Sequence, residues 1–282
     1  MTVKVVTDST SDIPAQVAQE LGITVVPLYI HFGHDVYQDG VDISADEFYH
    51  KLVTEPKLPK TSAPPSGVFT ETYEKLAAET DEIISIHISS KLSATYNTAL
   101  LGKEGMKVSC HVEVIDSLTT SIGLGLLVIT TAKAALAGAN LDEITAMVTQ
   151  NMPRTHYLGL VNTLEYLYKG GRLGKAQVFL GSMLNVKPLL TVQDGEVYPV
   201  ERVRGRSKAL AKLCELVGRF HPIKEMAIAY TTTPDELEVL HERLAPLFPQ
   251  GQLYKARTGS TIGTYLGPGA LTVAIIEEGA NL

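Results

Sequence analysis

Cysteine is scarce in this chain of 282 residues, which contains only Cys110 and Cys214. Neither has a second thiol or a histidine at metal-ligand spacing, so we expect two reduced, packed thiols and neither a disulfide framework nor a zinc site. Catalytic motifs are missing too. There is no G-x-S-x-G elbow, no P-loop and no G-x-G-x-x-G, and the eight histidines occur singly. No catalytic set can be read from the sequence.

An excess of positive charge is also lacking. The chain has 24 Lys and Arg against 31 Asp and Glu, giving a net charge of −7. This disfavours nucleic acid and anionic membranes as partners. The longest apolar stretch, residues 122–136, contains Thr130, Thr131 and Lys133 and is too short and too polar to span a membrane. Residues 1–6 lack the features of a signal peptide. We therefore expect a cytoplasmic protein without stable membrane insertion.

The hydrophobic pattern predicts two α/β domains, because a domain typically has about 100–200 residues. In the first half, strand and helix signals alternate, which indicates a parallel sheet covered on both faces. Strands are expected at 4–6, 24–32, 83–88 and 111–115, with helices between them that include 45–52, opened by a capping box at Ser44, and an apolar helix at 120–137. The proline-rich stretch 54–66 is expected to be a loop.

The second half has a different pattern, which predicts a mixed sheet. We expect strands at 157–162, 187–193, 196–204 and 226–231, helices at 207–220 and 235–247, and two final strands. Residues 164–184 are expected to be largely helical, and Asp194-Gly195 predicts a hairpin. The predicted architecture is a three-layer α/β/α domain at 1–154, a two-layer α/β domain with a mixed sheet at 155–282, and a ligand site between them.

Small hydroxyl residues cluster where several predicted strands end, at 7–12, 61–66, 89–96 and 116–117. Ligands of open α/β sheets bind outside the carboxyl ends of strands, where hydroxyls and free helix N–H groups can hold an anion. The alternative is that these residues merely cap helices. Their recurrence at successive strand ends favours a shared site for a small anion.

Six motifs in order resemble the DegV family over essentially the whole chain. They are Thr7-Asp8-Ser9-Thr10-Ser11-Asp12, Thr61-Ser62-Ala63-Pro64-Pro65-Ser66, Leu92-Ser93-Ala94-Thr95-Tyr96, Gly170-Gly171-Arg172-Leu173, Asn185-Val186-Lys187-Pro188 with Asp194-Gly195, and Gly267-Pro268-Gly269. The resemblance implies a fatty acid buried between two domains and no other cofactor. It also implies a non-catalytic, acyl-binding subunit of bacterial fatty acid kinase, whose separate ATP-using subunit phosphorylates the bound carboxylate for phospholipid synthesis.

The resemblance also implies residue roles. The family's carboxylate-holding positions match Thr61, Ser62 and Ser93, and we add Thr95, Tyr265 and Arg172 as candidates, although Arg172 could instead close the domain interface. The chain departs from the family at Ala94, where glycine is usual, and at Tyr265, where histidine is common. Candidates for the acyl tunnel, each of which could equally be plain core, are Leu28, Ile30, Phe179, Met183, Leu184, Ile262 and Leu266.

Arg202, Arg204 and Arg206 alternate along a predicted strand, which would place them on one face. They predict either a docking patch for the kinase subunit or a solvated basic edge. Two other functions stay open. The chain could be a stand-alone phosphotransferase or hydrolase acting on a small anionic substrate, or an interaction module in which the lipid is structural.

Overall fold

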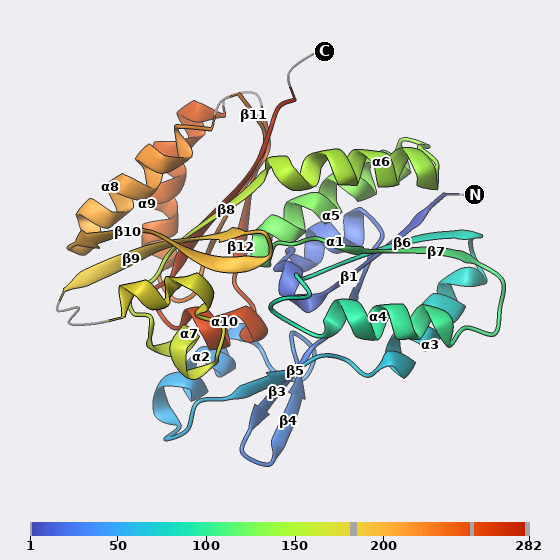
Figure 1. The fold of residues 1–282 in the computed structure, drawn as a ribbon, viewed down its shortest axis with the longest axis horizontal. Coiled ribbons are helices and arrows are strands. Elements are labelled where there is room, and N and C mark those ends of the chain that lie inside the picture. The colour runs from blue at the N-terminus through green and yellow to red at the C-terminus, as the bar shows by residue number, and fades with distance from the viewer. Residues whose placement is uncertain (1, 181–184, 221, 249–250, 280–282) are drawn as a thin grey trace.

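In the computed structural model, which describes residues 2–180, 185–220, 222–248 and 251–279, the chain forms two large sheets and one small sheet (Figure 1). The first large sheet has four parallel strands in the order β2-β1-β6-β7. Its strands are β1 (Lys4–Asp8), β2 (Ile23–Val26), β6 (Glu82–His87) and β7 (His111–Asp116). The predicted parallel sheet is therefore confirmed.

Helices cover both faces of the first sheet. Because side chains alternate along a strand, Val5 and Val6 point to opposite faces. Val5 shares a core with Leu124, whereas Val6 shares one with Phe69 and Tyr73. The covering helices are α3 (Ser66–Ala77) and α4 (Thr95–Glu104) on one face, and α1 (Ala15–Glu20), α5 (Ser121–Leu136) and α6 (Leu141–Asn151) on the other. The three-layer arrangement is the predicted one.

The second large sheet is mixed, as predicted, with the order β10-β9-β8-β13-β11-β12. Only β11 and β12 pair in parallel. Its strands are β8 (Thr155–Leu160), β9 (Val186–Gln193), β10 (Glu196–Arg204), β11 (Ile223–Tyr230), β12 (Leu253–Arg257) and β13 (Leu271–Glu277). Helices α8 (Arg206–Val217) and α9 (Pro234–Leu244) pack on one face.

Helix α5 packs against both large sheets, which explains why its sequence is apolar almost all round. Leu124 and Val128 face the first sheet. Ile122, Leu126 and Ile129 pack instead against Tyr157, Ala227 and Ala274 of the second sheet. The division of the chain at residue 154 stays a prediction, because this helix belongs to the cores of both sheets.

The small sheet was not predicted. Its strands β3 (Tyr29–Phe32), β4 (Asp35–Gln38) and β5 (Lys60–Ser62) pair antiparallel in the order β4-β3-β5. The prediction of one strand over 24–32 was wrong, because the chain leaves the first sheet at Pro27, which has no N–H to donate to a ladder. The prediction that 54–66 is entirely loop was also wrong at β5.

The two predictions based on helix-capping and turn residues were confirmed. Ser44 and Glu47 form the predicted capping box of α2 (Ala45–Thr54). Asp194 and Gly195 join β9 to β10 with φ angles of 49° and 80°, as a type I′ turn requires.

The region between β8 and β9 and the end of the chain differ from the predictions. Within the described part of 164–184, only α7 (Glu165–Lys169) is α-helical, and Gly174–Phe179 is a 3₁₀ segment. A short helix, α10 (Ser260–Leu266), lies between the two final strands and was missed. Short 3₁₀ segments also occur at Ser9–Ser11, Met152–Arg154 and Ala245–Leu247. Helix α10 packs on α2, β3 and β5, so it joins the end of the chain to the small sheet.

Candidate functional site

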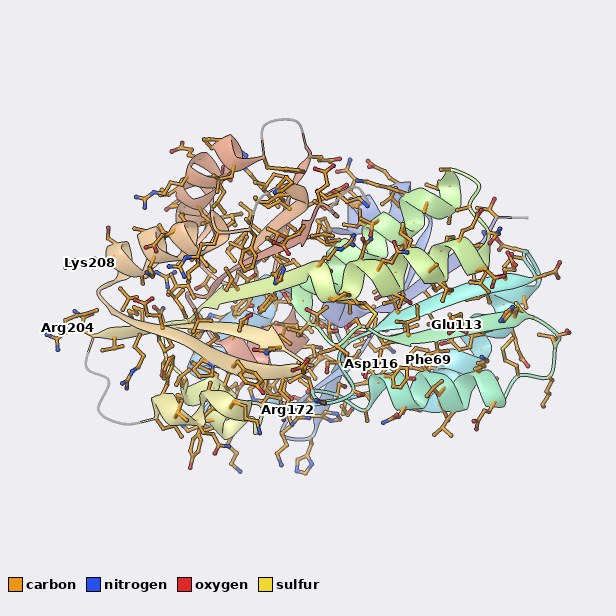
Figure 2. All side chains as sticks on the ribbon, turned by 45° about the horizontal axis from the view of Figure 1, so that its top comes forward. Phe69, Glu113, Asp116, Arg172, Arg204 and Lys208 are labelled. Atoms are coloured by element: carbon orange, nitrogen blue, oxygen red, sulfur yellow. The ribbon has the colours of Figure 1, made fainter. Side chains whose placement is uncertain are left out.

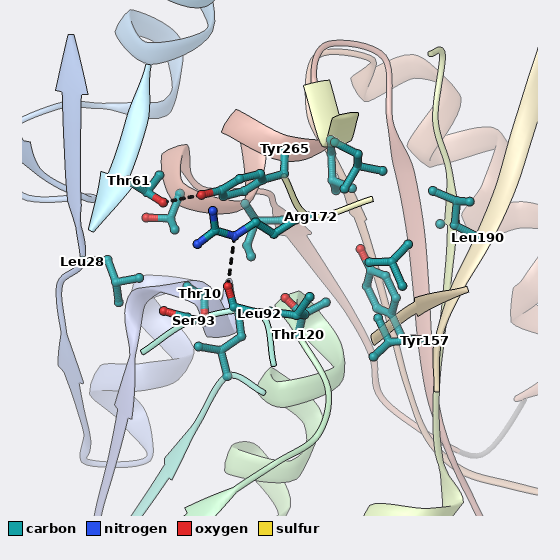
Figure 3. A pocket seen from close by; sticks show the side chains of 18 of the residues that line it. Thr10, Leu28, Thr61, Leu92, Ser93, Thr120, Tyr157, Arg172, Leu190 and Tyr265 are labelled. Carbon is teal, nitrogen blue, oxygen red and sulfur yellow. Dashed lines mark hydrogen bonds between the residues drawn. The ribbon is translucent and has the colours of Figure 1, made fainter. Parts of the chain in front are cut away.

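A cavity of about 280 Å³ lies where the two large sheets, the small sheet and α10 meet (Figure 3). This volume is near the lower end of the ~300–1,000 Å³ that is typical of small-molecule sites. One side is lined by residues that follow strands of the first sheet, such as Thr10 and Ser93, and by Thr61 and Ser62 of β5. The opposite side is lined by one face of the second sheet, including Leu190 and Val192 of β9.

Thr61, Arg172 and Tyr265 form the polar end of this cavity. The hydroxyl oxygens of Thr61 and Tyr265 are 2.6 Å apart and share a hydrogen bond. The guanidinium carbon of Arg172 lies 5.2 Å from the centre of the Tyr265 ring. Its Nε donates to the Leu92 carbonyl at 3.2 Å and its Nη1 to the Gly170 carbonyl at 3.0 Å. Among the described lining residues, Arg172 carries the only formal charge.

Gly170 allows this arrangement. A Cβ at this position would lie 2.5 Å from the Tyr265 ring and 3.0 Å from the Tyr166 carbonyl oxygen. Both distances are shorter than van der Waals contact permits. The Gly170-Gly171 pair therefore ends α7 and lets the Tyr265 ring pack directly on the backbone beside Arg172.

Ser62 and Ser93 line the same cavity, whereas Thr95 does not. Thr95 is buried at the start of α4. Its hydroxyl lies 2.8 Å from that of Ser93 and its N–H donates to Ser93 Oγ at 3.3 Å. Thr95 is thus placed to orient Ser93 from behind the cavity wall. Ser62 is exposed at the rim, where its hydroxyl hydrogen-bonds Nε2 of His31 at 2.9 Å.

Three of the predicted tunnel residues, Leu28, Ile262 and Leu266, line the cavity. Ile30 does not. It is fully buried in the core between the small sheet and α2, next to Phe48. Phe179 does not line the cavity either, and its ring centre lies 5.2 Å from the guanidinium carbon of Arg202. Met183 and Leu184 lie outside the described residues. The remaining apolar wall comes from residues that the sequence analysis did not select, namely Ile88, Leu92, Val161, Leu167, Leu190, Val192 and Val197.

Ala94 fits the backbone without strain. Its φ of −76° and ψ of 0° are right-handed, so the position does not need glycine in this chain. Alanine is therefore compatible with the backbone that carries Ser93.

The first hydroxyl cluster, residues 7–12, serves mainly to hold the structure together. Asp8 is fully buried and accepts hydrogen bonds from the N–H groups of Thr10 and Ile88 and from Nδ1 of His87. On its other side, His87 Nε2 lies 2.7 Å from Ser85 Oγ. This Asp–His–Ser chain resembles a catalytic triad, but all three side chains are inaccessible to solvent and none lines the cavity. Only Thr10 of the cluster faces the cavity.

Asp12 and Asp39 bind the start of α10 from the other half of the chain. Asp12 accepts from the Gly259 N–H at 2.8 Å, and Asp39 accepts from the N–H groups of Ser260 and Thr261 at 2.9 and 3.1 Å. Burial raises the pKa of Asp12 to about 8, although hydrogen bonds from Ser121 and Gly259 favour the ionised form. These two aspartates hold the helix that carries Tyr265.

Thr10, Thr120 and Thr261 are lining hydroxyls that the sequence analysis did not select. The Oγ1 of Thr261 is buried without a hydrogen-bond partner among the described residues, although its side chain borders the cavity. Thr10 and Thr120 stood in or beside hydroxyl clusters. Thr261 did not lie in a hydroxyl cluster at a predicted strand end, and the helix that carries it, α10, was not predicted.

The three arginines proposed for docking do not lie on one face. Arg202 and Arg204 are exposed on β10, which is an edge strand. Arg206 instead begins α8 and makes an ion pair with Glu236, with an Nη2–Oε2 distance of 2.6 Å. The alternation stops because Gly205, at a φ of 87°, turns the chain out of the strand. Figure 2 shows Arg204 and Lys208 at the end of the molecule remote from Asp116, with Arg172 nearer its middle.

In the part of the chain that the structure describes, no three His, Cys, Asp or Glu side chains are grouped as a metal site would need. Within the same residues, no helix is both long enough and apolar enough to cross a bilayer.

Comparison with known proteins places the chain in a family. The family model described as "Uncharacterised protein, DegV family" matches residues 2–278. A DegV domain-containing protein of Caldanaerobacter subterraneus is 36% identical over 98% of this chain and 99% of its own length. Protein DegV of Bacillus subtilis is 32% identical over 97% of this chain and 98% of its own.

Solved structures agree with this placement. A DegV family protein from Thermus thermophilus, described by its fatty acid binding, superposes with a TM-score of 0.91 at 30% identity, covering 99% of this chain and 100% of that one. DegV of Bacillus subtilis, described as a fatty acid binding protein, gives a TM-score of 0.89 at 30% identity over 99% and 100% of the two chains. The chain therefore belongs to the DegV family.

Proposed function

We propose that this protein binds a long-chain fatty acid, with the carboxylate at Thr61, Ser62, Ser93, Arg172 and Tyr265 and the hydrocarbon against the apolar wall. The observation that carries this proposal is the polarity of one cavity. The Arg172 guanidinium and several hydroxyls line one end, and Leu190 lies on the opposite side in Figure 3. The fatty acid binding of the relatives from Thermus thermophilus and Bacillus subtilis supports the same ligand class.

The energetics suit such a ligand. Burying a methylene contributes about 0.8 kcal/mol, so some fifteen methylenes contribute about 12 kcal/mol before the costs of association. A carboxylate cannot enter an apolar cavity unpaired without a large penalty. Each charge-assisted hydrogen bond returns only about 1.5–3 kcal/mol. The hydrocarbon tail therefore supplies most of the affinity, and Arg172 with the hydroxyls fixes the position of the head group.

The protein then presents the head group to a separate kinase subunit. In that reaction a carboxylate oxygen attacks the γ-phosphorus of ATP. An oxygen–phosphorus bond forms, the bond from the γ-phosphorus to the bridging oxygen breaks, and ADP leaves with the electron pair. Arg172, which is the one cation among the described residues that line the cavity, also donates to two backbone carbonyls. It is therefore placed to hold the carboxylate rather than to activate a nucleophile, which supports a presenting subunit over a stand-alone phosphotransferase or hydrolase.

Mass spectrometry of the denatured, freshly purified protein tests the ligand. We expect a co-purified fatty acid in about equimolar amount, and a protein free of lipid that also fails to bind added fatty acid would contradict the proposal. Adding the kinase subunit and ATP then tests presentation, since acyl phosphate should form only with both proteins present. Turnover of an anionic substrate by this chain alone would favour the stand-alone enzyme instead.

A further inference from the structure

A second cavity, also of about 280 Å³, lies beside the polar end of the cavity proposed to hold the acyl chain, which we call the acyl cavity. It shares Thr61, Arg172 and Tyr265 with the acyl cavity, so these three side chains form a common wall. Its other lining residues are Leu58 and Pro59 before β5, Lys60 at the start of β5, Tyr166 and Lys169 of α7, Gly170 after α7, and Thr264 of α10. We call it the outer cavity.

The charge of the outer cavity differs from that of the acyl cavity. Its lining includes Lys60, Lys169 and Arg172 and no carboxylate among the described residues. Lys169 makes an ion pair with Glu165 at the surface. Lys60 is exposed and makes no ion pair with any residue that the structure describes. A concave site lined by one sign of charge attracts ions of the opposite sign, so the outer cavity favours an anion.

The common wall holds donors that can serve both cavities. Arg172 uses Nε and Nη1 for the carbonyls of Leu92 and Gly170, and its Nη2 makes no hydrogen bond with another described residue. Guanidinium groups bind phosphate in bidentate fashion, and lysines add point charge. The Tyr265 hydroxyl is held by Thr61 through one hydrogen bond, so a movement of either side chain would change the wall that the two cavities share.

We propose that the outer cavity is an oxyanion site that takes the phosphoryl group of an acyl phosphate, while the acyl chain stays in the acyl cavity. This inference rests on the proposed function and extends it. The anhydride oxygen would lie at the wall formed by Thr61, Arg172 and Tyr265. Lys60 and Lys169 would neutralise the phosphate charge on the outer side. The product would thus remain bound through both of its ends.

Inorganic phosphate is the probe for the test, titrated into the full-length protein as purified and followed by isothermal calorimetry. We expect saturable binding by the wild type and a loss of affinity of about tenfold in Lys60→Glu, which follows from reversing one cation beside a polyanion. The matched control is Lys57→Glu, which reverses an exposed lysine of the same segment that does not line the cavity. Its phosphate affinity should stay close to that of the wild type.

The fatty acid content of all three proteins is measured by mass spectrometry in parallel. Unchanged lipid with lost phosphate binding in Lys60→Glu supports the inference. Absence of saturable phosphate binding by the wild type, or equal affinity in the two lysine variants, overturns it even where fatty acid is present. Absence of fatty acid from every sample counts against the proposed function instead, so the two failures are distinguishable.

Discussion

The hydroxyl oxygen of Tyr265 lies 2.6 Å from that of Thr61, although the two residues are 204 positions apart in the chain. This hydrogen bond joins α10 to β5 at the polar end of the acyl cavity. Tyr265 stands where histidine is common in the family pattern. A phenol hydroxyl can both donate and accept a hydrogen bond, so here it can hold Thr61 and also contact a ligand.

Replacing Tyr265 with phenylalanine removes this hydroxyl and keeps the ring on which Arg172 packs. A hydrogen bond contributes about 0.5–1.5 kcal/mol, so we expect the affinity for a long-chain fatty acid to fall by about two- to tenfold. Displacement of a fluorescent fatty acid measures the effect. Tyr168→Phe is the control, since Tyr168 is exposed on α7 and does not line the cavity. Equal affinities in the two variants would remove the Tyr265 hydroxyl from the head-group site.

The charge of Arg172 is expected to distinguish a fatty acid from an alcohol of the same length. Arg172→Gln should weaken fatty acid binding by about ten- to a hundredfold, because a charge-assisted hydrogen bond of about 1.5–3 kcal/mol is lost. The affinity for the fatty alcohol should change little, which also reports whether the cavity is intact. A similar loss for both ligands would mean that Arg172 only supports the fold through its bonds to Leu92 and Gly170.

The apolar wall should determine the preferred chain length. Leu190→Phe adds volume inside the cavity and should shift the co-purified fatty acids toward shorter chains. Leu189→Phe is the matched control, because the neighbouring side chain points to the opposite face, into the core with α8 and α9. Overpacking costs about 1–3 kcal/mol of stability in either variant. Mass spectrometry gives the chain-length profile of the bound fatty acids. An equal shift in Leu190→Phe and Leu189→Phe would argue against the wall at Leu190 as the site of the acyl chain.

Arg202 is expected to affect the kinase reaction without affecting lipid binding. Arg202→Glu reverses an exposed charge on the edge strand β10, so it should suppress acyl-phosphate formation with the kinase subunit while the fatty acid content stays unchanged. Lys107→Glu makes the same change at an exposed site that lies before β7. If the fatty acid bound to Arg202→Glu is phosphorylated as fully as in the wild type, the arginines of β10 form only a solvated strand edge and no docking site.

Asp12 should make stability fall as the pH rises. Its pKa is raised from 3.8 to about 8 in the folded protein, so between these values the folded state holds a proton that the unfolded chain has lost. The free energy of unfolding therefore decreases with pH across this window. Asp12→Asn should flatten the decrease, because asparagine copies the protonated acid and tolerates the φ of 51° at this position.

Urea unfolding at pH values of about 5, 6.5 and 8 measures this slope, because these values lie in the range between the unfolded and folded pKa of Asp12. Glu71→Gln removes an exposed carboxylate on α3 and serves as the control. A slope in Asp12→Asn equal to that of the wild type would show that another group controls the pH dependence.

The sequence by itself determined the features that depend on local chemistry or on a periodic pattern. The capping box at Ser44 and the turn at Asp194-Gly195 formed as expected, because caps and type I′ turns are decided by a few adjacent residues. The parallel and mixed sheets followed from hydrophobic periodicity. The family motifs also identified Thr61, Ser62 and Ser93, and these residues line one cavity.

Only the tertiary structure decided which residues serve the cavity and which serve the core. Asp12 stood in a hydroxyl-rich strand end, yet it binds the start of α10, far along the chain. Ile30 and Leu28 are both apolar and near in sequence, but only Leu28 faces the cavity. These roles depend on contacts between distant segments, which composition and spacing do not specify. For the same reason, the Thr61–Tyr265 hydrogen bond and the outer cavity became visible only once α10 was placed against the small sheet.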